Sequence, residues 1–484
     1  MSINWTEERN LSMLMDYYEM TMSNGYFLNG FRDKKAVFDM FFRKIPDNGG
    51  FAIFAGLEQM IHYMQNLRFT QEDLDYFRSK GIFDEGFLEY LRDFRFECDV
   101  YAMEEGTPMF PNEPIIEVRG PVIQAQLVET MILLTINHQS LITTKANRMV
   151  RAARGRTVME FGSRRAQAPD AAILGARACY IGGCNATACT ITDRDYGVPA
   201  TGTMAHSWVQ MFDTEYEAFA SYARIYPQDC TLLVDTYNVL KSGVPNAIRV
   251  FDEIVVPAGY RPKGIRIDSG DIAYLSKKAR AMLDRAGYPD VKILASNSLD
   301  EYIIRDLELQ GAKVDSFGIG ERLITSKSDP VFGGVYKLVA VEKDGAYVPK
   351  IKISESNEKI TNPHYKNLYR LYDQEGKAVA DYICTGDEFL DTENPIDLTI
   401  FDPEATWKTF DLKGGRARSL LVPIFQKGEL VYQCPNLHEV REYCRQQVDT
   451  LWDEVTRFEN PHKYYVDLSQ KLWDLKTDML KRLK

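Results

Sequence analysis

Between Thr157 and Ile319 the chain alternates short apolar, strand-like runs with segments of helical spacing. The runs cover residues 157–161, 200–204, 232–235, 264–268, 291–295 and 316–319. Parallel strands need a crossover connection, usually a helix, so this alternation predicts a parallel sheet covered by helices. We expect the sheet to close into an α/β barrel rather than to stay open and doubly wound, because a barrel brings all the strand ends to one mouth.

Polar residues or glycines follow every run, at the strand ends where barrel enzymes keep their active sites. These strand ends are Phe161–Arg165, Thr203 with His206, Asp235–Asn238, Arg266–Asp271, Ser296 with Asn297, and Gly318–Gly320. Since the ends of barrel strands converge, we expect these side chains to share one pocket.

His206 lies between an Ala/Thr/Val-rich segment and an apparent helix, in the stretch Gly202–Trp208. The positive end of such a helix favours an anion or a phosphoryl group beside the imidazole. An imidazole also acts as a base or a nucleophile near neutral pH. The alternative is a histidine that is only hydrogen-bonded at a turn.

Arg266 and Asp268 fall on one face of their strand, because side chains alternate along a strand. An arginine forks onto a carboxylate or a phosphate, and a carboxylate binds a ribose diol or, through water, magnesium. An Arg/Asp ion pair inside a barrel is the alternative. Asp235 predicts either a metal or base carboxylate, or the N-cap of a helix at 237–240.

Phe161, followed by Arg164 and Arg165, suits a flat anionic ring together with a phosphate, or else a core ring beside solvated arginines. Gly318 and Gly320 either let backbone amides approach a phosphate or form a plain turn. The sequence contains no G-x-G-x-x-G or G-x-x-x-x-G-K-[ST] fingerprint. Any use of ATP must therefore rely on another kind of site.

The segments that flank the barrel are mixed in character. Before it we expect a helix at 11–30 ended by Gly25, a strand at 37–43, helices at 56–66 and 70–80, strands at 94–101 and 115–119, and a long helix at 124–154. After it we expect strands at 337–341, 351–354 and 368–372 and a charged helical end at 431–484. We divide the chain into an α+β domain at 1–135, the barrel at 136–350 and a β/helical part at 351–484.

The totals exclude several classes of protein. A chain of 484 residues is too long for one compact domain, and its net charge of -11 argues against a general binder of nucleic acid or membrane surfaces. The eight cysteines form no C-x-x-C pair and predict free thiols in a reducing cytoplasm. We find neither a signal-peptide pattern nor an apolar stretch long enough to cross a bilayer.

Seven blocks, in order along almost the whole chain, resemble the signature segments of the nicotinate phosphoribosyltransferase family. They are Asp16–Met22, Phe161–Ala166, Gly202–His206, Ile265–Asp271, Ser316–Gly320, Gly333–Lys337 and Glu459–His462. The resemblance implies an enzyme that joins nicotinate to phosphoribosyl pyrophosphate in NAD salvage, coupled to ATP. It also implies an irregular TIM-like barrel, a second α+β domain built from both ends of the chain, and a cytoplasmic homodimer with shared active sites.

Carried over residue by residue, the resemblance implies that ATP phosphorylates His206, with Asp235 and Asp268 as further catalytic residues. Nicotinate would be held by Tyr18 from the neighbouring subunit and by Phe161, Thr203 and Arg266. Phosphoribosyl pyrophosphate would be held by Arg164, Arg165, Asp268, Asn297, Gly318 and Gly320. Mg²⁺ would be held mainly by the pyrophosphate, with Asp235 near it.

The chain departs from the family pattern at Glu321, where threonine is common, and at Asn362–Lys366, which replaces a Pro-Gly turn. A glutamate beside a phosphate is unfavourable unless it turns away or serves a metal. Asn185 stands where the similar nicotinamide enzyme carries an aspartate, which would repel a carboxylate, so it favours the acid. The alternatives are a phosphoribosyltransferase acting on nicotinamide or another pyridine, and a non-catalytic relative that binds nucleotides.

Overall fold

The computed structural model describes residues 9–354 and 359–482, which form two compact units. Unit 1 combines Met1–Leu141 with Val331–Lys484, and unit 2 comprises Ile142–Pro330. Both flanks of the chain therefore belong to one unit. Helix α6 (Glu129–Ala152) runs from the first unit into the second.

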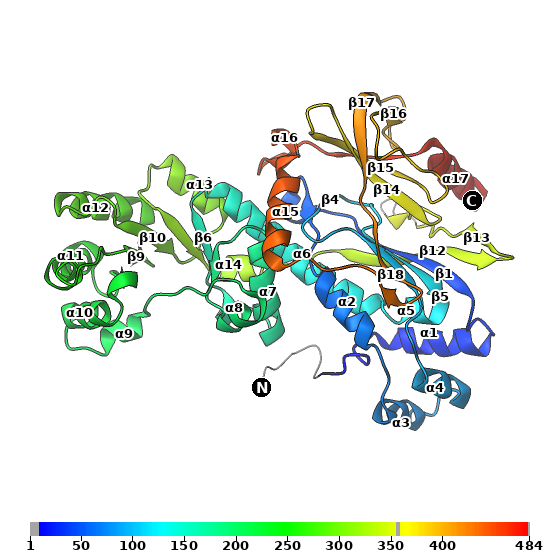
Figure 1. Cartoon of the computed structure of the whole chain (residues 1–484), viewed down its shortest axis with the longest axis horizontal. Helices are drawn as coiled ribbons and strands as arrows, with labels where there is room; N and C mark the ends of the chain where they lie inside the picture. The colour runs from blue at the N-terminus through cyan, green and yellow to red at the C-terminus, as the bar shows by residue number, and fades with distance from the viewer. Residues whose placement is uncertain (1–8, 355–358, 483–484) are drawn as a thin grey trace. The chain divides into compact units, whose positions relative to one another are not determined.

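Unit 1 is built on a seven-stranded antiparallel sheet with the strand order β13-β12-β1-β5-β3-β18-β19 (Figure 1). Its strands are β1 (Lys35–Phe42), β3 (Asp99–Ala102), β5 (Ile116–Pro121), β12 (Gly334–Lys343), β13 (Ala346–Pro349), β18 (Val422–Gln426) and β19 (Glu429–Leu430). All residues of β1 after Lys35 are buried, so both faces of this strand are covered. Met40 of β1 pairs with Tyr336 of β12, which joins the two flanks of the chain in one sheet.

The C-terminal flank adds a five-stranded sheet with the order β16-β17-β14-β15-β20. Its strands are β14 (Lys366–Tyr372), β15 (Ala378–Thr385), β16 (Ile396–Phe401), β17 (Thr409–Ser419) and β20 (Tyr465–Leu468). Arg370 lies directly opposite Asp381 across β14 and β15. A two-stranded sheet, β2 (Ala52–Ile53) with β4 (Pro108–Met109), completes the strands of this unit.

Some helices of unit 1 begin at side chains that cap them. Thr70 accepts a hydrogen bond from the Asp73 N–H, and Asn436 does the same for Glu439, both within capping boxes. The helical segments are α1 (Tyr17–Leu28), η1 (Pro46–Asn48), α2 (Leu57–Asn66), α3 (Gln71–Ser79), α4 (Glu85–Arg92), α5 (Val122–Gln126), α15 (Leu437–Asp449), α16 (Asp453–Thr456) and α17 (Gln470–Arg482).

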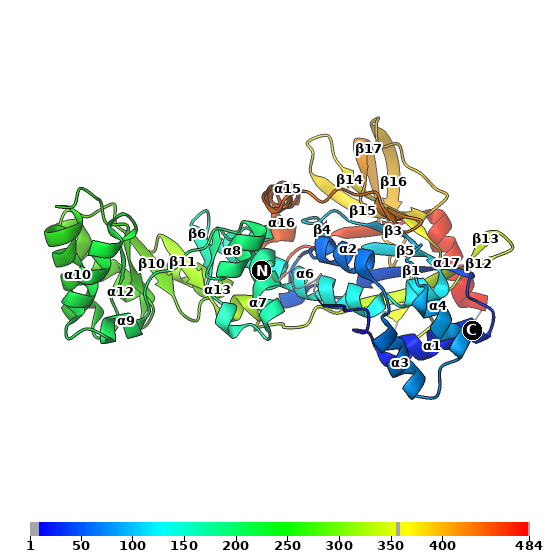
Figure 2. The same ribbon diagram turned by 60° about the horizontal axis from the view of Figure 1, so that its bottom comes forward.

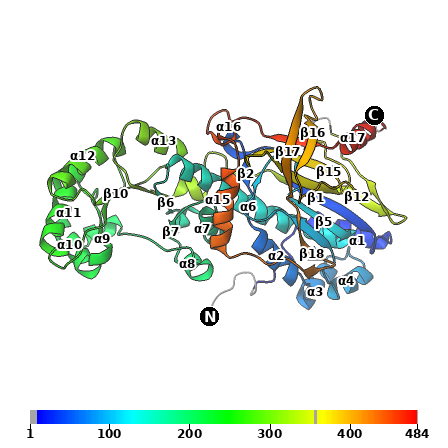
Figure 3. The same ribbon diagram turned by 45° about the horizontal axis from the view of Figure 1, so that its top comes forward.

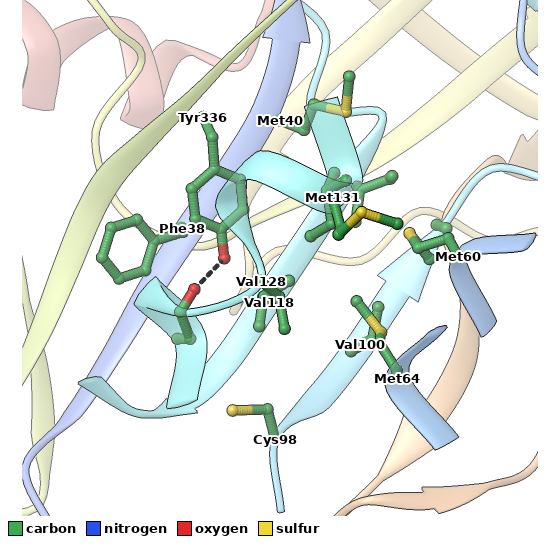
Figure 4. Close-up of a cluster of buried hydrophobic side chains, with 14 of the residues drawn as sticks. Phe38, Met40, Met60, Met64, Cys98, Val100, Val118, Val128, Met131 and Tyr336 are labelled. Atoms are coloured by element: carbon green, nitrogen blue, oxygen red, sulfur yellow. Dashed lines mark hydrogen bonds between the residues drawn. The ribbon is translucent and has the colours of Figure 1, made fainter. Parts of the chain in front are cut away.

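The core of unit 1 gathers methionine, valine and aromatic side chains (Figure 4). Phe38 and Tyr336 stack with ring centroids 4.9 Å apart. The Tyr336 hydroxyl donates to the Ala125 carbonyl at 2.7 Å, which supplies the partner that a buried phenol needs. Burial raises the pKa of Tyr336 well above its usual value, so the group acts only as a neutral donor.

Unit 2 contains a six-stranded parallel sheet with the order β7-β6-β11-β10-β9-β8. Its strands are β6 (Thr157–Glu160), β7 (Ala186–Thr187), β8 (Thr231–Leu233), β9 (Gly264–Ile267), β10 (Lys292–Ser296) and β11 (Ser316–Ile319). The helical segments are η2 (Ser163–Arg165), α7 (Pro169–Ile181), α8 (Thr190–Tyr196), α9 (His206–Gln210), α10 (Glu215–Ile225), η3 (Pro227–Asp229), η4 (Val239–Gly243), α11 (Val244–Val250), η5 (Phe251–Val255), α12 (Ile272–Arg285), α13 (Glu301–Leu309) and α14 (Glu321–Ile324).

The helices of unit 2 cover the sheet in two groups. Helices α10, α11 and α12 lie together beside β9 and β10 and enclose a core that includes Phe219, Leu232 and Ile265 (Figures 1 and 3). Helices α7 and α8 lie next to β6 and β7 (Figures 2 and 3). The predicted mixed α/β class with a parallel sheet is confirmed.

Five of the six predicted runs form strands of this sheet, but the run at 200–204 does not. Ala200 makes only an isolated bridge to Thr187, and β7 occupies the edge of the sheet instead. Pro199, next to this run, cannot donate to a ladder, and Gly202 has no side chain to pack, so both residues weaken strand formation here.

Four other element predictions need correction. Helix α1 begins at Tyr17 and continues through Gly25, and the predicted long helix is divided into α5 and α6. Residues 351–354 form no strand, and the C-terminal segment includes strand β20. A Cβ at Gly25 would meet no atom within 4 Å, so this glycine imposes no turn on the helix.

The described residues also bear on the expected classes of protein. None of their helices combines the length and apolar composition that membrane crossing requires. All eight cysteines are free. The described part of the chain contains no group of three or more His, Cys, Asp or Glu side chains arranged to hold a metal ion.

We expect Arg370→Ala to destabilise unit 1 strongly. The Arg370 guanidinium donates to both carboxylate oxygens of Asp381, at 2.8 and 2.6 Å, and neither side chain is exposed. Without it a buried carboxylate loses its cation, which costs about 3–5 kcal/mol of unfolding free energy. A urea titration followed by tryptophan fluorescence measures the loss. The control Arg445→Ala, which breaks only exposed pairs with Glu442 and Asp449, should leave the unfolding free energy nearly unchanged; equal losses would contradict the interpretation.

Candidate active site

Arg266, at the carboxyl end of β9, gathers side chains from several strand ends. Its Nε donates to Ser296 Oγ at 2.9 Å, Nη1 to Thr203 Oγ1 at 3.3 Å, and Nη2 to Asp268 Oδ1 at 2.8 Å. The guanidinium carbon lies 5.6 Å from the centre of the Phe161 ring, within the range of a cation–π contact. The structure therefore brings together Phe161, Thr203, Arg266 and Asp268, as the sequence predicts.

Two carboxylates lie side by side in this cluster. Asp268 accepts a second hydrogen bond from the Ser296 hydroxyl. Asp235 Oδ2 accepts from the Asp268 N–H at 3.1 Å and from the Ser269 hydroxyl at 2.5 Å. Asp235 Oδ1 is buried and has no hydrogen-bond partner among the described residues. A buried oxygen in this state calls for a water, a substrate hydroxyl or a cation.

The N-cap interpretation of Asp235 is wrong. The next helical segment, η4, is capped by Asn238, whose Oδ1 accepts from the Lys241 N–H at 2.8 Å. Asp235 turns instead to the backbone and the hydroxyl that follow β9. Its second carboxylate oxygen is therefore available for chemistry rather than for structure.

His206 is the first residue of α9 and contacts two polar side chains. Its Nδ1 lies 3.1 Å from Thr236 Oγ1, and its Nε2 lies 3.8 Å from Asp268 Oδ2. The His206 side chain is 41% exposed, so a ligand from solution can reach the ring. Helix α9 has only five residues, so these two side chains orient the ring more than the helix end does.

Phe161 follows β6 and packs across β11. Its N–H donates to the Ile319 carbonyl at 2.7 Å. A Cβ at Gly318 would lie 2.5 Å from the Phe161 ring, and one at Gly320 would lie 3.1 Å from the Phe161 carbonyl oxygen. The glycine at 318 therefore makes room for the aromatic ring, which is a different reason from the phosphate approach that the sequence suggests.

Three further residues that the sequence predicts to bind phosphate, Arg164, Arg165 and Asn297, also follow strands of this sheet. Arg164 and Arg165 form η2 with Ser163, directly after Phe161 and Gly162. Asn297 follows β10 with a positive φ of 78°, which a polar residue tolerates better than most. These positions share the strand-end side of unit 2, but no hydrogen bond joins them to Arg266 in the described residues.

Tyr18 belongs to unit 1, where it stands in the first turn of α1 and is 43% exposed. Burial of its ring and then the neighbouring Glu129 carboxylate, to which the hydroxyl is hydrogen-bonded, raise the pKa of Tyr18 well above its usual value. The phenol therefore stays neutral and can act only as an apolar surface and a donor. Its predicted role in nicotinate binding stays a prediction.

The profile of the nicotinate phosphoribosyltransferase N-terminal domain matches residues 13–137, and that of the C-terminal domain matches residues 365–476. The chain is 43% identical over 479 residues to a nicotinate phosphoribosyltransferase of Bacillus subtilis (strain 168), which covers 99% of this chain and 97% of that relative. The chain belongs to the nicotinate phosphoribosyltransferase family. The resemblance carried by the seven sequence blocks is confirmed, and the family is one of enzymes.

Other members agree in sequence and in fold. A nicotinate phosphoribosyltransferase of Mycobacterium tuberculosis is 38% identical over 465 residues, which is 95% of this chain and 92% of that protein. The crystal structure of human nicotinic acid phosphoribosyltransferase superimposes with a TM-score of 0.82 at 28% identity, covering 96% of this chain and 100% of that one. The whole described fold is thus that of the nicotinate phosphoribosyltransferase family.

The structure explains how this family member tolerates Glu321. Lys327 Nζ lies 2.6 Å from Glu321 Oε1, and Arg165 Nε lies 4.0 Å from Glu321 Oε2. The hydrogen bond from Lys327 lowers the pKa of Glu321, so the group stays charged but is neutralised by its neighbours. These two cations offset part of its negative charge.

The expectation that Asn185 favours the acid over the amide stays a prediction. Its Oδ1 accepts a hydrogen bond from the Val158 N–H at 3.0 Å, so the carboxamide is engaged with the backbone of β6. This placement gives Asn185 no recorded contact with Arg266 or Thr203.

Four polar residues hold the site together although the sequence analysis gave none of them a role of its own: Thr236, Ser269, Ser296 and Glu160. Three of them are hydroxyl residues inside the strand-end segments, next to residues that were singled out. Their position after a strand could have identified them as site residues. Hydroxyl residues are frequent at such positions, however, so the sequence pattern alone does not distinguish these three from others.

We expect Gly318→Ala to cost about 1–3 kcal/mol of unfolding free energy, because the new methyl group overlaps the Phe161 ring and forces one of them to move. The control is Gly202→Ala in the same unit, where a Cβ meets no atom within 4 Å, and we expect its effect to stay within about 0.5 kcal/mol. Urea unfolding of both variants measures the difference. Similar values for the two would show that the ring does not depend on this glycine.

Proposed function

We propose that this chain makes nicotinate mononucleotide and pyrophosphate from nicotinate and phosphoribosyl pyrophosphate, with ATP consumed through a phosphohistidine at His206. The observation that carries the proposal is the convergence of Phe161, Thr203 and Arg266 with Asp268 and His206 at the strand ends of unit 2. The names of the relatives, which agree over nearly the whole chain, support it.

Nicotinate would lie with its ring against Phe161 and its carboxylate toward Arg266 and Thr203. Each of the three Arg266 nitrogens donates one N–H, to Ser296, Thr203 and Asp268. A guanidinium has five N–H donors, so the second N–H of Nη1 and of Nη2 remains for a carboxylate. A charge-assisted pair of this kind distinguishes the acid from the amide, since the amide carries no negative charge. Tyr18 is proposed to cover the other face of the ring.

The transfer step forms one bond and breaks another. The pyridine nitrogen attacks the anomeric carbon of phosphoribosyl pyrophosphate, the bond from that carbon to the pyrophosphate oxygen breaks, and pyrophosphate leaves with the electrons. Such a step depends mainly on positioning and charge stabilisation. We assign the binding of phosphoribosyl pyrophosphate to Arg164, Arg165, Asp268, Asn297, Gly318 and Gly320.

Magnesium fits one feature of the site. Asp235 has a buried carboxylate oxygen without a partner and is the residue that would hold the ion, directly or through water. When bound, the ion supplies positive charge to the leaving pyrophosphate. Asp268 is already engaged by Arg266 and Ser296, so the pyrophosphate itself must supply most of the ligands.

ATP use requires His206 to take the γ-phosphoryl group: a nitrogen–phosphorus bond forms and the bond to ADP breaks. The ring is exposed, and Thr236 and Asp268 hold it from both nitrogens. Phosphorylation places new negative charge beside Asp268 and can tighten substrate binding only if the two states differ in affinity.

The proposal extends to the assembly. We propose that the parallel sheet of unit 2 belongs to an irregular TIM-like barrel at 136–350, with domains at 1–135 and 351–484 packed together. Two copies of the chain form a homodimer in the cytoplasm, and the second copy supplies Tyr18 to nicotinate. The alternatives are an enzyme for nicotinamide or another pyridine, and a relative that only binds nucleotides.

The assay that decides between these functions uses ATP, magnesium, nicotinate and phosphoribosyl pyrophosphate, with mass detection of the mononucleotide and of phosphohistidine. We expect both products, and we expect His206→Ala to abolish the phosphohistidine and the dependence of the rate on ATP. The control His62→Ala, on helix α2, should keep both. Turnover of nicotinamide in place of nicotinate would favour the first alternative, and unchanged ATP use in His206→Ala would contradict the assigned role.

Arg266→Lys tests the carboxylate contact. Lysine keeps a positive charge but loses the fork that reaches Ser296, Thr203 and Asp268. The loss of about 1.5–3 kcal/mol per charged hydrogen bond predicts a KM for nicotinate raised about 10- to 100-fold. Steady-state kinetics measure it, with the exposed Arg249→Lys as the control. An unchanged KM would remove Arg266 from the nicotinate site.

A further inference from the structure

Glu160 is a buried carboxylate to which neither the family resemblance nor the chemistry above assigns a role. It is the last residue of β6, is fully buried, and directly precedes Phe161. Its Oε1 accepts a hydrogen bond from the Gly162 N–H, and its Oε2 accepts from the Thr187 hydroxyl at 2.6 Å. The side chain therefore ties the turn that carries Phe161 to the neighbouring strand β7.

Thr187 extends this connection to a third segment. Its N–H donates to the Pro199 carbonyl at 3.0 Å, and its carbonyl accepts from the Thr201 N–H at 2.8 Å. Thr203, which binds Arg266, lies two residues further along the same segment. The path from Glu160 to Thr203 thus consists of one side-chain hydrogen bond and a short backbone pairing, all within unit 2.

This connection matters because the segment from 199 to 203 is not a strand. It lacks the ladder of hydrogen bonds that holds the other strand ends in register, and Thr187 is its bridge partner. The turn after β6 also depends on Glu160, which accepts the Gly162 N–H. The backbone at Gly162 packs closely, because a Cβ there would approach Ile324 and Gly320. The Glu160 carboxylate is therefore hydrogen-bonded both to the turn after β6 and to Thr187, the partner of the segment from 199 to 203.

We propose that Glu160 is a positioning residue for nicotinate, which acts through Thr187 to hold Phe161 and Thr203 at the spacing that the ring and its carboxylate require. This inference rests on the proposed function, which places those two residues on nicotinate. Glu160 itself touches no substrate. Burial raises the pKa of Glu160, while the bonds from Thr187 and Gly162 lower it, so these two donors are what keep a charged form tolerable inside the sheet.

The test compares Thr187→Val, which keeps the shape but removes the hydroxyl, with Thr187→Ser, which keeps the hydroxyl. Thr187→Val removes the hydroxyl bond to Glu160 and the bond that this hydroxyl accepts from the Cys189 N–H. We expect it to raise the KM for nicotinate at least about tenfold, with kcat and the KM for phosphoribosyl pyrophosphate within about twofold. Labelling of His206 by ATP should be unchanged. Thr187→Ser should restore the KM, and Glu160→Gln, which leaves the Thr187 bond to the Cys189 N–H in place, should repeat the rise.

Each other outcome counts against the inference. An unchanged KM for nicotinate in Thr187→Val and Glu160→Gln would overturn it. So would a loss of all kinetic parameters and of His206 labelling together with a lower Tm, because that result shows a merely structural role. If the unsubstituted chain makes no nicotinate mononucleotide, the proposed function fails and the inference fails with it, whereas a failure confined to the variants leaves the proposed function intact.

Discussion

The site depends on one partly buried guanidinium. Arg266 is enclosed by the ends of the strands, where an unpaired cation would be costly, and its hydrogen bonds to Asp268, Ser296 and Thr203 offset that cost. The same bonds fix the distances between β9, β10 and the segment that carries Thr203. Stability and function are therefore linked in this residue, because the contacts that make its burial tolerable also aim its remaining donors.

A parallel sheet makes this arrangement possible. Its strands all end at the same edge, so residues far apart in sequence, such as Phe161 and Arg266, meet there. The close approach of Phe161 to β11 then requires a glycine at 318. Sheet geometry sets the meeting point, and the absence of one side chain lets an aromatic ring occupy it.

The main sheet of unit 1 is built from both flanks of the chain. Strand β1 is covered on both faces and lies between β12 and β5, so the sheet forms only when both flanks of the chain are present. The buried pair of Arg370 and Asp381 likewise joins strands of the C-terminal flank. Unit 2 is inserted between these flanks, which keeps the catalytic candidates on a sheet of their own.

The sequence by itself determined the class of the fold, five of the six parallel strands and the residues at their ends, because hydrophobic periodicity and the position after a strand are local properties. It also determined the family, since seven blocks in order are specific. Only the tertiary structure decided the partners: that Asp235 binds the loop after β9 rather than capping a helix, that Asn185 faces a backbone, and that Ser296 and Thr236 hold the site. The physical reason is that a side chain's hydrogen bonds depend on which strand lies next to its own, and the order of strands in a sheet is not the order in the chain.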